Sequence, residues 1–322
     1  MSMTLSKLAK LANVSVSTAS KAFSMSREVN EETREMIFRI AKENGCFKHF
    51  FKAKYPRPVV AVLCPELHSR YYAILVRYIQ EELEKNGMDV CVSTYAFQQD
   101  IAHSQFDYYE RYTSVDAVVS IGARPLHVSE REIPTVVCGT EHVCDGADVS
   151  VCFEARDVLE EVIALCMEQG RRDIAFIGEP LTRSRRQAVE RVLQTKYGYE
   201  QVRCAESTQR FEDGGYEAFE QLLADGGVPQ AVICAYDSMA YGVLRGAHEH
   251  GIRVPEELFV VGYNNLPQSA YTIPSLTSVD FNGEKMAKTV ARLLQDLFAG
   301  TPTPREISVP AFLVCRESTG PV

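Results

Sequence analysis

The fold of the first module of this chain is indicated by residues 4–24, which read TLSKLAKLANVSVSTASKAFS. Thr4 is a favourable N-cap, and the apolar residues that follow it recur at helical spacing. Asn13 tolerates the left-handed conformation that a sharp turn between helices requires. Ser15 is in position to cap a second helix, from Val16 to Phe23. The stretch therefore predicts two short helices joined by a tight turn.

A third helix is predicted to support the first two. Asn30 is its predicted N-cap, and Gly45 is predicted to end it. Two glutamates in its first turn stabilise the helix, because their negative charges face the partial positive charge of the helix N-terminus. Two helices joined by a tight turn and followed by a supporting helix describe a helix-turn-helix, whose second helix fits the major groove of DNA. The exposed positions of that second helix are expected to be Val16, Ser17, Ser20 and Lys21.

Charge divides the chain into two parts. Residues 1–58 hold eleven Lys and Arg against five Asp and Glu, a net charge of +6, whereas the whole chain carries −9. The remaining residues therefore carry −15. A small basic module joined to a large acidic one favours a polyanion as the partner of the basic module.

The composition excludes several classes of protein. The start of the chain has no uninterrupted apolar stretch typical of a signal peptide, and no run approaches the roughly eighteen apolar residues of a membrane span. The ten cysteines form no C-x-x-C pair and mostly lie in apolar runs, which favours reduced, buried thiols over disulfides or zinc. We therefore expect a cytoplasmic protein without a metal or cofactor.

The segment from Thr4 to Ser24, with the later segment from Val29 to Arg34, resembles the headpiece of the lac repressor and galactose repressor family of bacterial transcription regulators. The resemblance implies that Val16, Ser17 and Lys21 read base edges while other polar side chains clamp phosphates. The other predicted DNA contacts are Leu5, Ser6, Ser15, Thr18, Ser20, Ser24, Asn30, Thr33 and His49. The family usually has an arginine at the position of Lys21, and a lysine cannot make the same bidentate contact to guanine.

Residues 49–58 are predicted to link the headpiece, residues 1–48, to the rest of the chain. In the resembled family a hinge helix folds here on the operator and inserts a leucine into the minor groove, but this linker contains no leucine. Two interpretations remain open. In the first, Phe50, Phe51 or Tyr55 supplies an apolar wedge. In the second, the basic residues follow the phosphates and the aromatic residues pack on the core.

Short strands of the buried type alternate with helical patterns from residue 59 onward. The expected strands are Val59–Cys64, Val90–Ser93, Ala117–Ile121, Thr135–Cys138, Ile174–Ile177, Ala231–Cys234 and Phe259–Val261. The expected helices are Tyr72–Gly87 and, roughly, residues 104–113, 154–169, 184–196, 214–225, 237–250 and 283–299. This alternation predicts an α/β fold of parallel sheets with helices on both faces. The length favours two doubly wound lobes with a cleft between them.

This part of the chain resembles the effector domain of the same family, which is similar to periplasmic sugar-binding proteins. The matching segments are Gly170–Gly178, Tyr236–Gly242, Val260–Asn265 and Ile273–Val279. We place lobe one at about residues 59–169 and 283–310, and lobe two at about residues 170–282 and 311–322. The resemblance implies a small effector in the cleft, commonly a sugar, a sugar phosphate or a nucleobase.

Ligands of open parallel sheets bind beyond the carboxyl ends of the strands. The candidate effector residues near those ends are Tyr71, Tyr72, Tyr236, Asp237, Asn264 and Phe281. The resemblance adds an arginine that grips the effector, which matches Arg186, with Arg185 one residue from that register. The family commonly has an aspartate where this chain has Asn264. Compared with the family pattern, these positions have fewer hydrogen-bond acceptors and more aromatic rings. This favours stacking of the rings on an apolar face of the ligand, with Arg186 as the ionic anchor.

The sequence contains none of the common catalytic or phosphate-binding motifs that an α/β enzyme would carry. We therefore predict no catalytic residue and no enzyme. The expected function is that of a transcription repressor, a homodimer on a pseudo-palindromic operator, whose DNA affinity a small effector adjusts. The resemblance implies dimer contacts on the helix around Tyr72–Leu83 of the amino-terminal lobe and on its carboxy-terminal counterpart. The alternative function is a cytosolic small-molecule-binding protein whose basic headpiece docks to a protein.

Overall fold

The computed structural model describes residues 3–51, 57–113, 115–123 and 133–320. The chain forms two compact units: unit 1 comprises residues 1–152 and 284–307, and unit 2 comprises residues 153–283 and 308–322. Residues 153–169, which the sequence analysis placed in lobe one, group with unit 2.

The headpiece contains the helices α1 (Leu5–Leu11), α2 (Val16–Phe23), α3 (Glu31–Glu43) and α4 (Phe47–Phe50). The side chains of Thr4, Ser15 and Asn30 each accept a hydrogen bond from a backbone N–H three residues later, at 3.3, 2.9 and 2.8 Å. Asn13 has a φ of 52°, so the turn between α1 and α2 uses the left-handed region. The predicted helix-turn-helix is confirmed.

An aromatic cluster continues the headpiece beyond its predicted end. The ring of Phe50 lies 5.6 Å from that of Phe23, and the rings of Phe47 and Phe51 stack at 4.8 Å. Phe50 and Phe51, two of the three candidate wedges, therefore pack against the headpiece core, as the second interpretation of the linker expects. The third candidate, Tyr55, lies outside the described residues.

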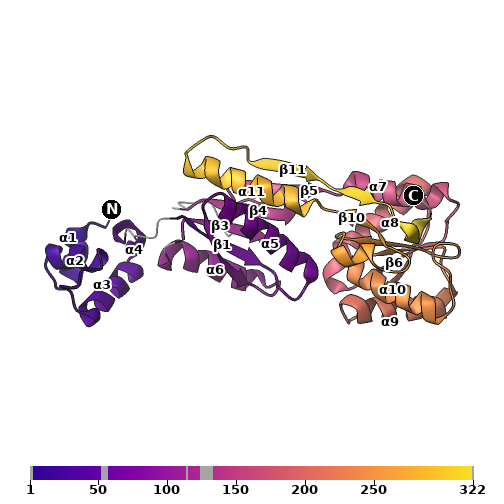
Figure 1. The fold of residues 1–322 in the computed structure, drawn as a ribbon, viewed down its shortest axis with the longest axis horizontal. Helices are drawn as coiled ribbons and strands as arrows, with labels where there is room; N and C mark the ends of the chain where they lie inside the picture. The colour runs from indigo at the N-terminus through magenta and orange to yellow at the C-terminus, as the bar shows by residue number, and fades with distance from the viewer. Residues whose placement is uncertain (1–2, 52–56, 114, 124–132, 321–322) are drawn as a thin grey trace. The chain divides into compact units, whose positions relative to one another are not determined.

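The first sheet, to which unit 1 contributes nearly all residues, has the strand order β11-β5-β4-β3-β1-β2. Its strands are β1 (Val59–Cys64), β2 (Asp89–Thr94), β3 (Ala117–Ile121), β4 (Thr135–Thr140), β5 (Val149–Glu154) and β11 (Glu306–Pro310), of which β1 to β5 pair in parallel. The helices beside it in Figure 1 are α5 (Arg70–Lys85), α6 (Gln99–Tyr112) and α11 (Gly283–Phe298). Phe106 and Tyr109 of α6 share a buried core with Leu63 of β1, so α6 covers one face of the sheet.

The second sheet lies in unit 2 and has the order β12-β10-β9-β8-β6-β7. Its strands are β6 (Ile174–Gly178), β7 (Arg203–Glu206), β8 (Ala231–Cys234), β9 (Phe259–Tyr263), β10 (Thr277–Asp280) and β12 (Phe312–Val314). All pairs are parallel except β10 with β12. The helices of the unit are α7 (Arg156–Glu168), α8 (Arg183–Tyr197), α9 (Phe211–Gly226) and α10 (Asp237–Glu249), with short 3-10 turns at Pro180–Thr182, Pro267–Ala270 and Glu317–Thr319. The predicted α/β fold with two parallel sheets is confirmed.

Helices α9 and α10 meet backbone to backbone. A Cβ atom added to Gly242 of α10 would lie 2.0 Å from the carbonyl oxygen of Glu212, and one added to Gly215 of α9 would lie 2.0 Å from that of Met239. No side chain fits at these distances, so the approach of the two helices depends on glycine at both positions.

Candidate functional site

The face of α2 that is predicted to read DNA is exposed and rests on a packed core. Val16, Ser17 and Ser20 are exposed, whereas the opposite side of the helix buries two alanines and a phenylalanine. Lys21 is less exposed, and its ammonium group forms an ion pair with Glu28. One apolar group, two hydroxyls and a cation are thus held in fixed positions on one helix.

The remaining predicted DNA contacts fall into two groups. The first group consists of the N-terminal residues of α2 and α3, where Ser15 Oγ lies 2.8 Å from Thr18 Oγ1 and the Thr33 N–H donates to Asn30. Helix N-termini of this kind favour bound phosphate because their N–H groups and dipoles point outward. The second group is spread over α1, α2, the end of α2 and α4: Leu5 is half-buried, and Ser6, Ser20, Ser24 and His49 are exposed.

In unit 2, Arg185 lies where three strands end. Its guanidinium carbon is 4.6 Å from the ring centroid of Tyr263, the last residue of β9, and 5.3 Å from that of Phe281, which follows β10. Arg185 also donates to the carbonyl of Ala235, which follows β8. Within the described part of the chain this is its one hydrogen bond, and Arg185 has no carboxylate partner.

Arg186 has different surroundings. Its Nε lies 2.8 Å from a carboxylate oxygen of Glu190, and its Nη1 lies 3.1 Å from one of Glu206. These two hydrogen bonds raise the pKa of Arg186 above its usual range. Glu190 lies on α8, as Arg186 does, and Glu206 is the last residue of β7. Arg186 therefore links α8 to β7 within unit 2. The geometry favours Arg185, and not Arg186, as the cation that a ligand meets.

Asp237 is a buried structural residue, contrary to its prediction as an effector contact. It has no exposed surface, and its Oδ2 accepts hydrogen bonds from the Leu266 N–H at 2.6 Å and the Ser269 hydroxyl at 2.7 Å. Its Oδ1 accepts from the Ser278 hydroxyl at 2.5 Å. Burial raises the pKa of Asp237 to about 7, although the hydrogen bonds act in the opposite direction. The side chain joins the start of α10 to the segment after β9 and to Ser278 within β10.

Tyr236 and Asn264 lie at strand ends, as predicted. The Tyr236 hydroxyl accepts a hydrogen bond from the Phe211 N–H at 3.2 Å, and the two rings are 5.9 Å apart. Asn264 has a φ of 99°, and its N–H donates to the Val279 carbonyl at 2.8 Å. Phe211 was missed because it follows β7, a strand that the sequence analysis did not predict.

Unit 1 has its own aromatic group beyond the ends of β1 and β2. The rings of Tyr71 and Tyr72, at the start of α5, are 5.2 Å apart, and the Tyr72 ring lies 5.9 Å from that of Phe97. The buried Tyr95 donates its hydroxyl proton to the Ile121 carbonyl at 2.7 Å. Tyr95 and Phe97 were not predicted, although Tyr95 directly follows β2 and Phe97 lies two residues further on. Both therefore lie beyond the carboxyl end of a parallel strand, where ligands of such sheets bind.

Backbone strain gathers at the same strand ends. Eight non-glycine residues of the described chain have a positive φ, and six of them follow strands: Ala96, Phe97, Phe211, Asn264, Asn265 and Asn282. Such conformations cost about 1–3 kcal/mol each and cluster at functional sites. The carboxyl ends of both sheets are therefore the candidate binding regions, each within its own unit.

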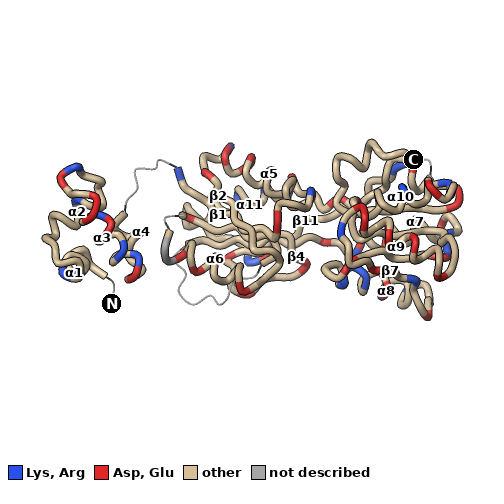
Figure 2. The backbone as a smooth tube through the Cα atoms, turned by 90° about the horizontal axis from the view of Figure 1, so that it is seen from below, with Lys and Arg blue, Asp and Glu red and all other residues tan. Residues whose placement is uncertain are grey.

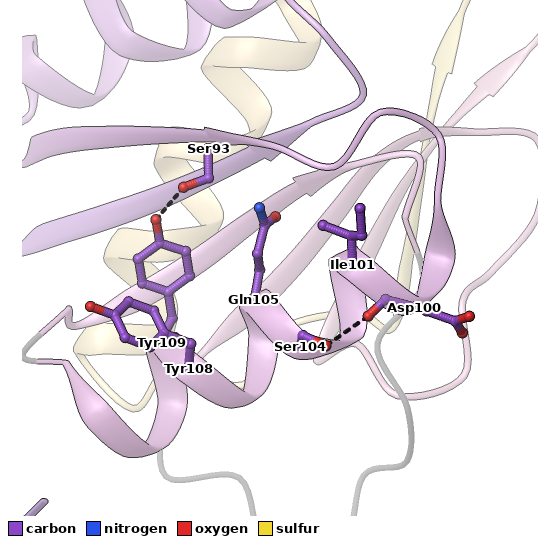
Figure 3. Close-up of a pocket in the computed structure, with 7 residues that line it drawn as sticks. All are labelled: Ser93, Asp100, Ile101, Ser104, Gln105, Tyr108 and Tyr109. Carbon is purple, nitrogen blue, oxygen red and sulfur yellow. Dashed lines mark hydrogen bonds between the residues drawn. The ribbon is translucent and has the colours of Figure 1, made fainter.

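A pocket of about 470 Å³ opens elsewhere in unit 1, beside edge strand β2 (Figure 3). Its lining comes from α6 and the end of β2: Ser93, Asp100, Ile101, Ser104, Gln105, Tyr108 and Tyr109. The hydroxyl groups of Ser93 and Tyr109 form a hydrogen bond with each other, and the Ser104 hydroxyl donates a hydrogen bond to the backbone carbonyl of Asp100 at 2.9 Å. None of the predicted site residues lines this pocket.

The headpiece and the carboxy-terminal half of the chain each match a known family. Residues 4–45 match the family described as bacterial regulatory proteins, lacI family, and residues 163–319 match the periplasmic binding protein-like domain. The chain belongs to the lacI family. As a lacI-family protein it is a DNA-binding transcription regulator that a small effector modulates, and it is not an enzyme.

Named relatives of this lacI-family chain are transcriptional repressors. The HTH-type transcriptional repressor PurR of Escherichia fergusonii is 26% identical over 350 aligned residues, which cover 98% of this chain and 96% of the relative. PurR of Erwinia tasmaniensis is 27% identical over 324 residues, which cover 91% and 89%. The predictions of family, operator DNA and effector are confirmed.

Two solved structures show the same fold. The transcriptional regulator CelR in complex with cellobiose has a TM-score of 0.67 and 27% identity, covering 98% of this chain and 100% of that chain. The lac repressor dimer bound to operator and the anti-inducer ONPF has a TM-score of 0.72 and 22% identity, with both chains fully covered. Among the helices of the described lacI-family chain, none has the length and apolar character that a membrane span requires.

Proposed function

We propose that the chain is a cytoplasmic transcription repressor whose helix α2 reads an operator through Val16, Ser17 and Lys21. The observation that supports this role is the exposed face of α2, because its N-cap is formed and its opposite face is buried in a packed core. A helix held in this way keeps its side chains in a fixed register, which reading of base edges requires. The capped N-termini of α2 and α3 are proposed to hold the flanking phosphates.

The charge distribution supports the same role. Residues 1–58 carry a net charge of +6, whereas α9 of unit 2 carries five acidic residues and no Lys or Arg (Figure 2). DNA phosphates attract the basic segment and repel acidic surfaces, so the headpiece is the part that the polyanion favours. Because one headpiece covers too few bases for high specificity, we propose a homodimer with α5 in the dimer contact and a pseudo-palindromic operator.

The effector is proposed to bind at the carboxyl ends of the unit 2 strands, with Arg185 as its anchor and Tyr236 and Asn264 beside it. Effector binding can change operator affinity only if the effector binds more tightly to one of two conformations of the protein, one with high and one with low affinity for the operator. The size of the change is limited by that difference in effector affinity. Coupling of this kind is typically about 1–3 kcal/mol, or roughly 5- to 150-fold in operator affinity.

Lys21→Ala is expected to weaken operator binding about 10- to 100-fold, because one base contact is worth about 1–3 kcal/mol. The preference for operator over random duplex is expected to fall with it. Operator sequences are first selected by sequencing bound DNA, and affinities are then measured by fluorescence anisotropy at several salt concentrations. Lys10→Ala, which removes an exposed cation from α1, is the control and should weaken all duplexes alike. Equal losses on operator and random duplex in Lys21→Ala would show that Lys21 contacts only phosphate.

Glu28→Gln is expected to tighten binding to every duplex, because it removes a negative charge from the DNA side and releases Lys21 from its ion pair. We expect an affinity gain of about three- to tenfold and a slope of log affinity against log salt that is steeper by about 0.9. Anisotropy titrations from low to high salt give both values. Glu35→Gln removes the same charge from an exposed site on α3 that has no contact with Lys21, and should change binding less. An unchanged salt slope in Glu28→Gln would contradict this role of Glu28.

A further inference from the structure

Arg57 fastens the chain to unit 1 two residues before β1 begins. Its Nη2 donates to the backbone carbonyl of Glu84 at 3.0 Å and to that of Met88 at 3.2 Å. Its Nε lies 3.2 Å from a carboxylate oxygen of Asp89, the first residue of β2. The half-buried side chain therefore joins this part of the chain to the end of α5 and the start of β2.

The chemistry of these contacts suits an arginine. The last carbonyls of a helix lack partners within the helix, and the helix dipole favours a cation beside them. Glu84 lies in the last turn of α5, and Met88 lies between α5 and β2. A guanidinium presents several donors in one plane, whereas a lysine ammonium is a single point charge. Arg57 can therefore reach two carbonyls and a carboxylate at once.

The chain is also held on the carboxyl side of Arg57. The Asp89 N–H donates to the Pro58 carbonyl at 2.8 Å, and the Val59 N–H donates to the carboxylate of Asp116 at 2.7 Å. These two hydrogen bonds do not involve the Arg57 side chain. If the contacts of Arg57 were lost, Pro58 would become the first residue fixed to unit 1.

The other side of the linker is fixed in the headpiece. The ring of Phe51 stacks on that of Phe47 at 4.8 Å and lies 5.3 Å from that of Phe38. The Phe51 N–H donates to the Phe47 carbonyl at 2.7 Å, and Phe47 is buried. Phe51 therefore moves with the headpiece.

Five residues, 52–56, connect these two fixed points, and we call them the tether. A chain advances at most about 3.3–3.6 Å per residue, so the Cα atoms of Phe51 and Arg57 are no more than about 20–22 Å apart. One base pair inserted between two half-sites moves one of them by about 3.4 Å and turns it by about 35° around the duplex axis. A long tether absorbs such a change at little cost, whereas a short one does not.

We infer that the tether makes this protein select one spacing between operator half-sites, and that Arg57 positions the end of the tether at unit 1. The inference rests on the proposed function, because it requires two headpieces on one pseudo-palindromic operator. Arg57 acts through the chain that it holds. Its loss lengthens each tether by one residue, to Pro58, so two tethers gain about 7 Å, the rise of about two base pairs.

Anisotropy titrations of the full-length protein on operators of altered spacing test the inference. One base pair is removed or inserted between the half-sites of the selected operator. The wild-type protein is expected to bind both altered duplexes at least about tenfold more weakly than the selected operator. Arg57→Gln should reduce this loss to less than about threefold. At the selected spacing, the variant should bind about two- to threefold more weakly than the wild type, because a longer tether lowers the effective concentration.

A second variant leaves Arg57 in place. Two residues, Gly-Ser, are inserted between Lys54 and Tyr55, which lengthens each tether by about 7 Å. This insertion should also reduce the loss on altered spacing to less than about threefold. Arg57→Lys keeps the charge beside Asp89 but not the planar set of donors, so its spacing preference should lie between those of the wild type and Arg57→Gln.

Arg305→Gln is the matched control. Arg305 also pairs with a carboxylate within unit 1, that of Asp145 at 2.7 Å, and its loss should leave the spacing preference unchanged. The ratio of affinities between spacings separates positioning from folding, because a partly unfolded variant loses affinity for all duplexes alike.

Two outcomes overturn the inference. In the first, the wild-type protein binds all spacings alike. In the second, Arg57→Gln or the Gly-Ser insertion keeps the full spacing preference of the wild type. A wild-type protein that binds no duplex more tightly than random DNA reveals failure of the proposed function instead.

Discussion

Gly242→Ala is expected to unfold unit 2 at temperatures at which the wild-type protein is folded. The added Cβ would lie 2.0 Å from the Glu212 carbonyl oxygen and 2.5 Å from the Tyr216 nitrogen, so backbone atoms of α9 stand in its way. Side chains can rotate out of a clash, but the backbone of a packed helix must move as a whole. We expect a loss of at least about 3 kcal/mol, a large part of the roughly 5–15 kcal/mol that stabilises a typical domain.

Thermal unfolding followed by calorimetry measures this loss. Gly226→Ala is the matched control, because Gly226 lies in the last turn of α9 and its added Cβ meets the guanidinium end of the Arg203 side chain, at 3.0 Å, and no backbone atom. That substitution should change stability by no more than about 1 kcal/mol, since alanine is the better helix former. If Gly242→Ala melts as the wild type does, α9 and α10 do not pack at the distance described.

The helix-turn-helix could be predicted from sequence because local signals determine it. Thr4, Ser15 and Asn30 each cap the helix that follows, and Asn13 takes up the left-handed turn. The central strands could also be predicted from the sequence, because a strand that is buried on both faces consists of an uninterrupted run of apolar residues. Val59–Cys64 is such a run, and its observed bounds equal the predicted ones.

Strands that lack such runs were missed. Edge strand β7 reads Arg-Cys-Ala-Glu and is mostly half-buried, so its composition is that of a loop. Strand β5 places Ser150 in the core, where its hydroxyl accepts a hydrogen bond from the Cys144 N–H at 2.9 Å. Strands β10, β11 and β12 were also not predicted. Their positions depend on tertiary pairing, which local composition does not reveal.

The candidate effector site could be predicted by region but not by residue. The strand-end rule located Tyr236 and Asn264, yet it could not choose between Arg185 and Arg186, whose side chains point about 100° apart around a helix. Only the positions of Glu190 and the strand-end aromatic rings distinguish the two arginines. The same limit applies to Asp237, because the serines that enclose it lie more than thirty residues away in the chain.

Asp237 should make the stability of the folded protein fall as pH rises from about 4 to about 7. Its pKa is about 7 in the folded protein, because burial disfavours the charged form, against an ordinary value of 3.8. Between these values the unfolded chain has released the proton that the folded chain still holds, so a rising pH favours unfolding. One proton contributes a slope of up to about 1.4 kcal/mol per pH unit, which disappears below pH 4 and above pH 7.

Asp237→Asn should remove this slope, because an amide stays neutral over the whole range. Its oxygen can keep the hydrogen bonds from the Leu266 N–H and the Ser269 hydroxyl, and its NH₂ group can donate to Ser278 Oγ once that hydroxyl turns. Urea unfolding at pH 4.5, 6 and 7.5 compares the variant with the wild type. Asp225→Asn, at an exposed site on α9, is the matched control and should keep the wild-type slope. A slope that survives Asp237→Asn would have to come from another group, whereas one that vanishes places a buried proton between the start of α10, the segment after β9, and β10.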